Sequence, residues 1–462
     1  MARRVVIIGL DCVPPKLAFE RYRAQMPNLS ALMQSGTWGP LRSCVPPITV
    51  PAWAAMLTGR DAGELGLYGF RKRVDGAYSL QNARASDLQQ PWIWQRLRAA
   101  GKRVAALFVP PGYPLPSADA DTTLVSCMLT PGADRPHTHP AALANEIADR
   151  FGPYIPDLAD VRSGDRAALL QQLYAMTAQH FAIAAHVFTQ QRPDFMVMVE
   201  IGPDRLHHAF WQSFDPQHPR HDPQDPFLDC ARDYYAFLDA ELGKLLALFD
   251  EDTTVLIVSD HGARPLQGGI CVNEWLIEHG LLVLAEPPEG PTSPSRLAVD
   301  WTRTRAWAEG GYYARVCLNV EGREPQGIVQ RAQYVKQRQE IIGLLEAIPG
   351  PDGERLAHRV LTPEACFRAL NGSPPDILAF LGDLDYRAIG SVGFGRLHIT
   401  GNDTGPDGCN HDWDGIFVMS GGGVAGLGEV YGYEIFDVYR TVLGLLDLTR
   451  DNQALGVDRS VS

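Results

Sequence analysis

The chain has 462 residues, of which 45% are hydrophobic and 21% are charged, and its formal net charge is −13. This length and composition are typical of a folded protein larger than one small domain, and they exclude a disordered chain. The acidic charge argues against a protein that coats nucleic acid, but it permits an anionic substrate, because bound cations can reverse the field at a site.

Apolar runs rich in β-branched residues alternate with helix-like stretches through the first half of the chain. Residues 5–10 are typical of a buried parallel strand. Similar runs follow at 104–109, 195–199 and 255–258, and amphipathic patterns typical of helices lie at 92–100, 169–189 and 234–248. This alternation predicts an α/β fold with a central, mostly parallel sheet covered by helices on both faces.

Two stretches are expected to be additions to this sheet. Residues 112–165 are rich in Pro, Asp and Ala and predict loops with short helices. Residues 268–375 contain a tryptophan segment at 273–276 and a helical pattern at 330–347, and they predict an inserted cap subdomain. The core is therefore expected to comprise residues 1–267 and 376–462, resuming with strands at 376–380 and 415–420 and closing with a helix at 433–446.

Two groups of polar residues stand directly after predicted core strands. Asp11 follows the strand at 5–10, and Asp260 and His261 follow the strand at 255–258. Ligands gather at the carboxyl ends of parallel strands, so these side chains are expected to converge. Adjacent residues of a strand point to opposite faces of the sheet. Gly262 is therefore expected to break the strand, so that both Asp260 and His261 can point into the same site. Taken alone, Asp11 could equally be a turn or helix-capping residue.

Thr49 is expected at the start of a helix. Pro51 suits the first turn of that helix and Gly59 suits its end. A helix N-terminus favours a bound phosphate through its free backbone N–H groups and its dipole. Thr49 could simply cap the helix. As a nucleophile its hydroxyl would need a metal or a base to lower its pKa.

A second pair of candidate ligands, Asp204 and His208, lies after the strand at 195–199. If a helix begins at Asp204, the two side chains lie one turn apart on one face, and His207 points elsewhere as the weaker alternative. His411 precedes the strand at 415–420 in an expected loop, with Asp412 and Asp414 as competing ligands. The combined set suits two divalent cations and a metal-activated nucleophile: Asp11, Thr49, Asp204, His208, Asp260, His261 and His411.

Nearly the whole chain resembles the alkaline phosphatase superfamily, and most closely its type I phosphodiesterase/nucleotide pyrophosphatase branch. The matching motifs are Gly9-Leu10-Asp11, Pro46-Pro47-Ile48-Thr49-Val50-Pro51-Ala52-Trp53, Asp204-Arg205 with His208, Ser259-Asp260-His261-Gly262, Asn273-Glu274-Trp275-Leu276, Gly322-Arg323-Glu324-Pro325 and His411 with Asp414-Gly415-Ile416-Phe417. Sulfatases of this broad class carry Cys-x-Pro-x-Arg, whereas Cys44 is followed by Ile48 at the arginine position. A sulfatase is therefore rejected, and Cys44 is expected to be a packed thiol.

The resemblance implies a division of the ligands between two metals. One metal would be held by Asp11, Thr49, Asp260 and His261, and the other by Asp204, His208 and His411. Thr49 would attack phosphorus and form a phospho-threonine intermediate, which water would then hydrolyse. Zinc suits this mixture of Asp, His and hydroxyl ligands best, with manganese as the alternative. Three aspartates and a threonine alkoxide give about −4 against +4 from the ions, so a phosphate ester can bind without net repulsion.

The favoured activity is that of a phosphodiesterase or nucleotide pyrophosphatase. No third carboxylate set of the magnesium type and no arginine clamp of the phosphomonoesterase kind is recognisable in the sequence. A phosphomonoesterase, a phosphonate hydrolase and a phosphomutase are the alternatives within the same chemistry. A non-catalytic protein that binds a phosphorylated ligand is the alternative from another class, and it is disfavoured because every ligand position and the nucleophile are filled.

The expected compartment is the cytoplasm. The apolar run before Asp11 is too short for a signal-peptide core, no run reaches the length of a membrane span, and the eight cysteines form no CxxC pair. The expected partner is a small-molecule phosphoester, with neither a nucleic-acid polymer nor a membrane. The oligomeric state stays open.

Overall fold

The computed structural model describes residues 4–159, 165–448 and 451–460. Its largest sheet has the strand order β20-β2-β19-β9-β1-β8-β5-β6-β7, with β21 also paired to β2. Strands β9, β1, β8, β5 and β6 are parallel neighbours, and β19 and β7 run antiparallel to theirs. The strand bounds are β1 Arg4–Leu10, β2 Thr37–Arg42, β5 Val104–Leu107, β6 Thr122–Val125, β7 Thr138–His139, β8 Phe195–Glu200, β9 Thr253–Val258, β19 Asp414–Gly421, β20 Gly428–Glu429 and β21 Tyr433–Glu434.

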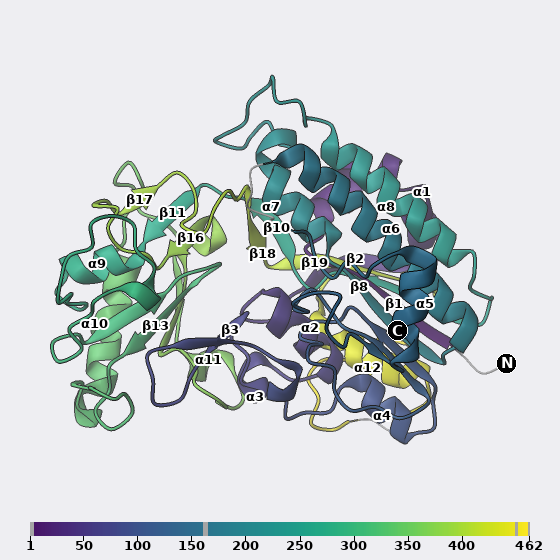
Figure 1. The fold of residues 1–462 in the computed structure, drawn as a ribbon, viewed down its shortest axis with the longest axis horizontal. Helices are drawn as coiled ribbons and strands as arrows, with labels where there is room; N and C mark the ends of the chain where they lie inside the picture. The colour runs from purple at the N-terminus through teal and green to yellow at the C-terminus, as the bar shows by residue number, and fades with distance from the viewer. Residues whose placement is uncertain (1–3, 160–164, 449–450, 461–462) are drawn as a thin grey trace.

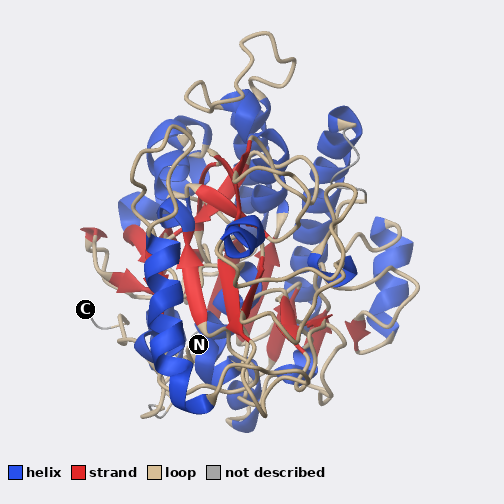
Figure 2. Cartoon of the chain, turned by 90° about the vertical axis from the view of Figure 1, so that its left-hand side faces the viewer, coloured by secondary structure: helices blue, strands red, loops and turns tan. Residues whose placement is uncertain are grey.

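Helices cover both faces of this sheet (Figures 1 and 2). Along β1, Val6 and Ile8 point into one apolar core and Val5 and Ile7 into the other, because successive strand residues alternate between faces. The first core includes residues of α1 Pro27–Ser35, α5 Ala142–Phe151, α6 Arg166–Gln191, α7 Gly202–Phe214 and α8 Cys230–Leu246; the second includes α2 Thr49–Thr58, α4 Ile93–Ala99 and α12 Ile435–Leu445. The predicted architecture, a mostly parallel sheet between two helical layers, is confirmed.

The segment 112–165 differs from its prediction. Its helix α5 was expected, but strands β6 and β7 extend the large sheet beyond β5. All four residues of β6 are buried, so this strand lies inside the core. The Pro- and Asp-rich composition of the segment concealed it, because β6 is only four residues long.

The large sheet and its covering helices are here called the core lobe. A second lobe, here called the cap lobe, contains β11 to β17 and lies beside it (left in Figure 1). Its four-stranded sheet has the order β12-β13-β15-β14 and is antiparallel, and a three-stranded sheet has the order β16-β11-β17. The bounds are β11 Gly268–Cys271, α9 Val272–Glu278, β12 Ala306–Glu309, β13 Ala314–Leu318, α10 Tyr334–Glu346, β14 Arg359–Leu361, α11 Pro363–Cys366, β15 Ile377–Phe380, β16 Tyr386–Ile389 and β17 His398–Ile399.

The predicted return to the core sheet at residues 376–380 is wrong. This strand, β15, pairs with β13 and β14 of the cap lobe, and the next strand of the large sheet is β19. A short buried strand has the same apolar sequence pattern in either sheet, so the sequence could not show which sheet it joins. We propose that the cap extends beyond Pro375 to about β17; the division of the chain into two domains remains a proposal.

Two small sheets connect the lobes. The hairpin of β3 Arg71–Arg73 and β4 Leu80–Asn82 follows α3 Ala62–Leu65 and lies between the lobes in Figure 1. The pair of β10 Gly262–Pro265 and β18 Cys409–Asp412 is antiparallel and lies next to the carboxyl end of β9. Arg73 of the hairpin donates a hydrogen bond of 2.8 Å to Glu324 of the cap lobe, so an ion pair links the two parts.

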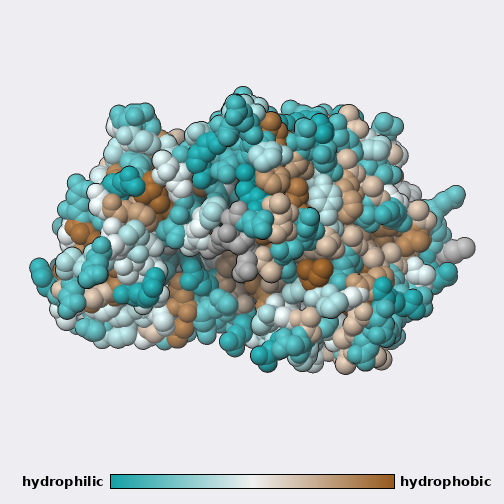
Figure 3. All heavy atoms as spheres, turned by 45° about the horizontal axis from the view of Figure 1, so that its top comes forward, coloured by the Kyte–Doolittle hydropathy of each residue, from teal (hydrophilic) through white to brown (hydrophobic). Residues whose placement is uncertain are grey.

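Hydrophobic side chains on the face shown in Figure 3 form small separate patches among hydrophilic ones, as is usual for a folded protein surface. None of the helices in residues 4–159, 165–448 and 451–460 combines the length and apolarity needed to cross a membrane.

The motif at Gly322 to Pro325 has a structural role inside the cap lobe. The guanidinium of Arg323 donates to both carboxylate oxygens of Asp376, at 2.7 and 2.6 Å. Asp376 also accepts from the hydroxyl of Tyr334 and from the backbone N–H of Leu318. This buried carboxylate therefore joins the loop after β13, helix α10 and the start of β15.

Replacing Asp376 with Asn should destabilise the cap lobe by about 2 kcal/mol, because the change removes one partner of a largely buried ion pair. This is less than the loss of about 3–5 kcal/mol typical of a fully buried ion pair, because Arg323 is partly exposed. Urea unfolding followed by intrinsic tryptophan fluorescence measures the effect. Glu340→Gln is the matched control, because the exposed pair of Glu340 and Lys336 at 3.9 Å should contribute less than about 0.5 kcal/mol. Equal losses in the two variants would contradict this role.

Candidate functional site

All seven predicted site residues converge at the carboxyl edge of the large sheet. Asp11 follows β1, Asp260 and His261 lie between β9 and β10, and Thr49 is the first residue of α2. The other three come from two elements: Asp204 and His208 from α7, and His411 from β18. Every one of the seven is buried, with His208 the most accessible at 8%. His411 was expected in a loop, but it lies in a strand paired to β10, which aligns it beside Ala263.

The first half of the site consists of Asp11, Asp260, His261 and Thr49. The Nε2 atom of His261 lies 3.2 Å from Asp260 Oδ2 and 3.7 Å from Asp11 Oδ1. The hydroxyl of Thr49 lies 3.2 Å from the same nitrogen. One carboxylate oxygen from each aspartate, one imidazole nitrogen and one hydroxyl therefore face a common point, and the two carboxylates and the imidazole form a group that could hold a metal ion.

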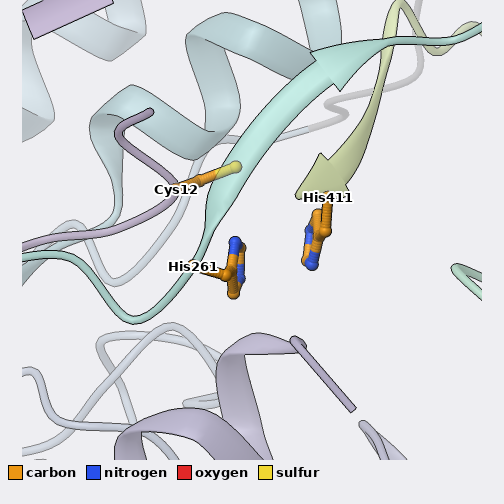
Figure 4. A group of neighbouring side chains, drawn as sticks. All are labelled: Cys12, His261 and His411. Atoms are coloured by element: carbon orange, nitrogen blue, oxygen red, sulfur yellow. The ribbon is translucent and has the colours of Figure 1, made fainter. Parts of the chain in front are cut away.

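The second half of the site consists of Asp204, His208 and His411. Asp204 Oδ1 lies 3.2 Å from Nε2 of His208 and 3.6 Å from Nε2 of His411. Asp204 and His208 share one face of α7 because they are four residues apart. The rings of His261 and His411 stack with centroids 3.8 Å apart, so the two halves adjoin (Figure 4).

Four buried polar atoms in this cluster lack a hydrogen-bond partner within the described residues: Asp11 Oδ1, Asp204 Oδ1, Asp260 Oδ2 and His411 Nε2. A buried polar atom without a partner is costly, and natural proteins rarely keep one without a reason. These four atoms are the ones that face the centre of the two groups. The donor set of carboxylate oxygens and imidazole nitrogens fits divalent cations such as zinc or manganese.

The opposite atoms of the same side chains are held by the surrounding protein. Trp53 Nε1 donates to Asp11 Oδ2 at 2.7 Å. The Nδ1 atom of His411 lies 2.9 Å from the carbonyl oxygen of Pro47, and Nδ1 of His208 lies 2.7 Å from Asp407 Oδ1. An Nδ1–H that donates to these oxygens leaves Nε2 with its lone pair directed at the site, which is the arrangement of metal-bound histidines.

Burial and the neighbouring charged groups shift the pKa values of the site residues. Burial, and then the neighbouring Asp204, raises the pKa of Asp11 well above its ordinary value, and burial together with Asp11 does the same to Asp260. Burial lowers the pKa of His411 to about 4. For Asp204, burial raises the pKa, but the contacts with His208 and His411 outweigh burial and lower it. Bound cations would reverse the shifts of Asp11 and Asp260, because they favour the carboxylate form.

The competing residues lie outside the cluster. Nε2 of His207 lies 3.1 Å from the hydroxyl of Tyr235, and burial lowers the pKa of this histidine to about 3. Asp412 pairs with Arg264, and Asp414 pairs with Arg42. Cys44 is buried, as expected of a packed thiol.

Gly262 has a different role from the one expected. Strand β9 ends at Val258 and β10 begins at Gly262, so the break that presents Asp260 and His261 lies before the glycine. A Cβ atom on Gly262 would lie 2.2 Å from the carbonyl oxygen of Asp414. The glycine is therefore required by the close approach of the neighbouring strand. Ser259 holds the break, because its hydroxyl accepts from the N–H of Val13 and donates to the carbonyl of His261.

Three residues near the site were missed from the sequence. Asp407 contacts His208, and its pKa is lowered because Arg387 and His208 outweigh the effect of burial. Tyr312 of the cap lobe places its hydroxyl 3.3 Å from His208 Nε2 and stacks on His411 with centroids 3.6 Å apart. The guanidinium of Arg387 lies 3.9 Å from the centroid of the Tyr312 ring. Asp407 lies four positions before His411, and this closeness in sequence was a weak indication that it belongs near the site. Tyr312 and Arg387 lie in segments without a recognisable sequence motif.

The convergent Asp, His and Thr side chains at the edge of an α/β sheet form a donor set that suits metal-assisted hydrolysis of phosphoesters. The sequence model described as type I phosphodiesterase/nucleotide pyrophosphatase matches residues 5–407. The chain belongs to this family, which is metal-dependent, and family membership supports a metal-dependent phosphoester hydrolase. No curated protein matches the chain in a sequence comparison.

Solved structures share the fold over nearly the full length. Phosphonoacetate hydrolase from Sinorhizobium meliloti 1021 is 18% identical, with 96% of each chain covered and a TM-score of 0.63. Human ectonucleotide pyrophosphatase/phosphodiesterase 5 is 14% identical, with 98% of this chain and 97% of that chain covered and a TM-score of 0.59. An inactive form of the murine protein, in complex with AMP, is 14% identical with coverages of 99% and 97% and a TM-score of 0.58. These similarities confirm the alkaline phosphatase-like fold.

Removal of divalent cations should lower the melting temperature. The buried carboxylates of Asp11, Asp204 and Asp260 lose their compensating charge, and an ion present at 100 times its Kd stabilises the folded state by about 2.7 kcal/mol. Scanning calorimetry with zinc, with manganese and with chelator measures the shift. Asp11→Asn keeps an oxygen to accept from Trp53 and should show a much smaller shift. An unchanged chelator effect in that variant would contradict a metal at Asp11.

Replacing Asp407 with Ala should weaken metal binding by about 10- to 100-fold, because the change removes the acceptor that orients His208. Competition with a chromogenic chelator measures the affinity. Asp403→Asn is the matched control, since Asp403 accepts hydrogen bonds from Ser391 and does not contact the site histidines. A similar loss in both variants would show that the segment, and not the contact with His208, is responsible.

Proposed function

We propose that this protein hydrolyses phosphodiesters or pyrophosphates with Thr49 as the nucleophile at a two-metal centre. The observation that carries the proposal is the set of buried, unpartnered donor atoms gathered beside the Thr49 hydroxyl. One ion would be held by Asp11, Thr49, Asp260 and His261, and the other by Asp204, His208 and His411. Zinc suits the donor set best, with manganese as the alternative.

Divalent ions at these positions would neutralise charge on the phosphoryl oxygens and lower the pKa of the Thr49 hydroxyl. Thr49 stands at the N-terminus of α2, where the helix dipole favours the negative charge of a phosphoryl group and of the attacking oxygen. Trp53, on the next turn of the same helix, holds Asp11 through its indole N–H. Helix α2 therefore carries the nucleophile and orients a neighbouring ligand.

The reaction would proceed in two displacements. Thr49 Oγ1 attacks phosphorus, the P–O bond to the leaving group breaks, and the proton from the Thr49 hydroxyl passes through solvent to the leaving oxygen. The product of this step is a diester of the Thr49 side chain with the remaining phosphoryl group. Water then attacks the same phosphorus, the Oγ1–P bond breaks, and a proton from the water restores the hydroxyl of Thr49.

The size of the adjoining cavity supports a diester with a sizeable leaving group. The cavity lies between the lobes, has a volume of about 1030 Å³, and is lined next to the site by Ile48, Arg205 and Tyr312. This is at the upper end of the range of about 300–1,000 Å³ typical of small-molecule sites. A small phosphonate or a simple phosphate monoester would leave most of this space to water.

Hydrolysis of bis-p-nitrophenyl phosphate and of p-nitrophenyl phosphate tests the proposal. We expect metal-dependent cleavage that favours the diester and is abolished by chelator. Thr49→Ala should lower kcat by about 10⁶-fold, the order of loss found when the nucleophile of a covalent mechanism is removed. Thr58→Ala, at the other end of α2, is the matched control and should retain activity.

Other outcomes would redirect the assignment. Preference for the monoester would favour a phosphomonoesterase. Phosphate transfer without net release would favour a phosphomutase, and release of phosphate from a phosphonate would favour a phosphonate hydrolase. Undiminished turnover in Thr49→Ala would refute the nucleophile. Binding of phosphorylated ligands without turnover of any ester would favour a non-catalytic binding protein.

A further inference from the structure

The cavity between the lobes has two walls with different origins. One wall is the hairpin of the core lobe, which contributes Arg71 and residues 78–80. The other is the four-stranded sheet of the cap lobe, which contributes Trp307, Glu309 and Arg315. The metal-site end is marked by Tyr312, whose ring centroid lies 6.4 Å from that of Phe70. Arg71 is the next residue in the chain after Phe70 and also lines the cavity.

Strand register explains why Arg315 faces the cavity. Glu309 of β12 is paired with Arg315 of β13, so the two residues share one face of the cap sheet. The alternate residues point the other way: Ala308 and Val316, also a register pair, belong to the apolar core of the cap lobe. The face of the cap sheet that carries Glu309 and Arg315 therefore borders the cavity, and the opposite face belongs to the apolar core of the cap lobe.

The arginines that line the cavity fall into two kinds. Arg205 pairs with Asp157 and Asp204, and Arg387 pairs with Asp407, so the charges of both are compensated within the protein. Arg71 and Arg315 form no ion pair within residues 4–159, 165–448 and 451–460. The guanidinium of Arg315 donates one hydrogen bond, of 2.7 Å, to the backbone carbonyl of Arg71, and this bond holds the two residues together.

Two carboxyl groups line the same cavity. Asp403 is engaged with the hydroxyl and N–H of Ser391. Glu309 forms no ion pair with Arg71 or Arg315, and burial raises its pKa although Arg315, Arg71 and Arg73 oppose the rise. Arg71 and Arg315 both line the cavity, and guanidinium groups bind phosphate and carboxylate groups through charge-assisted hydrogen bonds.

We propose that Arg71 and Arg315 form a second anion site, so that the preferred substrate is a phosphodiester whose leaving group itself carries an anionic group, a phosphate or a carboxylate. This inference rests on the proposed function, since it defines the substrate of the same site. The hairpin of the core lobe and the sheet of the cap lobe each supply one arginine, so the site requires both lobes.

Matched aryl methyl phosphodiesters test the preference. The leaving phenol or 4-hydroxybiphenyl carries a carboxamide, a carboxylate or a phosphonate at its far end, and the two ring lengths sample two depths of the cavity. We expect kcat/KM for at least one length to be higher for the charged leaving groups. Arg71→Gln and Arg315→Gln should each lower the ratio of charged to uncharged substrate by about tenfold, the loss expected for one charge-assisted hydrogen bond.

Two further variants separate the anion site from general effects. Arg71→Lys should keep part of the preference, because lysine retains the charge without the planar fork. Arg232→Gln on α8 removes an exposed arginine outside the cavity and should leave the ratio unchanged. Equal ratios in wild type and in both glutamine variants, at both ring lengths, would overturn the proposal. A preference confined to the carboxylate or to the phosphonate would identify which anion the site takes.

Calorimetric binding of the free phenols distinguishes this proposal from the proposed function. The charged phenols should bind the wild-type protein more tightly than the carboxamide, and the glutamine variants should lose about tenfold in that difference. If no ester is hydrolysed but the charged phenols still bind through Arg71 and Arg315, the proposed function fails and the anion site stands. If esters are hydrolysed and the charge makes no difference to binding, the anion site fails alone.

Discussion

The buried carboxylates of Asp11, Asp204 and Asp260 impose the main constraint on this structure. Burial raises the pKa values of Asp11 and Asp260, and repulsion from the neighbouring carboxylates raises them further. The surrounding groups do not remove this repulsion. Trp53, Pro47 and Asp407 contact the outward-facing atoms of Asp11, His411 and His208. Among the residues that the structure describes, the atoms facing the centre of the site have no hydrogen-bond partner. The cluster therefore suits cations, and the Thr49 hydroxyl beside it is the proposed nucleophile.

The core lobe satisfies this constraint with rigid elements. Parallel strands β1 and β9 bring Asp11 and Asp260 to one edge, and helices α2 and α7 present Thr49 and the second ligand pair from either side. The buried carboxylate of Glu200, at the end of β8, fixes the start of α7 by accepting from the N–H of Gly202. Each functional side chain is thus positioned by backbone that is itself packed in a core.

The cap lobe contributes one of the two walls of the cavity beside the candidate site. Tyr312 reaches from the cap sheet to His208 and His411, so the cavity and the candidate metal centre share a boundary. The ion pair of Arg73 with Glu324 links the hairpin to the loop after β13. The ion pair of Arg323 with Asp376 links that loop to the start of β15 in the cap sheet. Two family motifs, at residues 273–276 and 322–325, lie in this lobe; in the second, Arg323 and Glu324 make these structural ion pairs.

The sequence by itself determined the α/β class, the positions of β1, β8 and β9, and the seven candidate site residues, because each of these signals is local: an apolar run, a helix start or a polar residue at a strand end. Tertiary structure alone decided that residues 377–380 join the cap sheet, that β6 lies in the core, and that His411 lies on a strand. It also decided the contacts of Asp407, Tyr312, Arg71 and Arg315. The physical reason is that strand partners and cavity walls depend on which surfaces meet in space, and residues far apart in the chain leave no periodic pattern that records such a meeting.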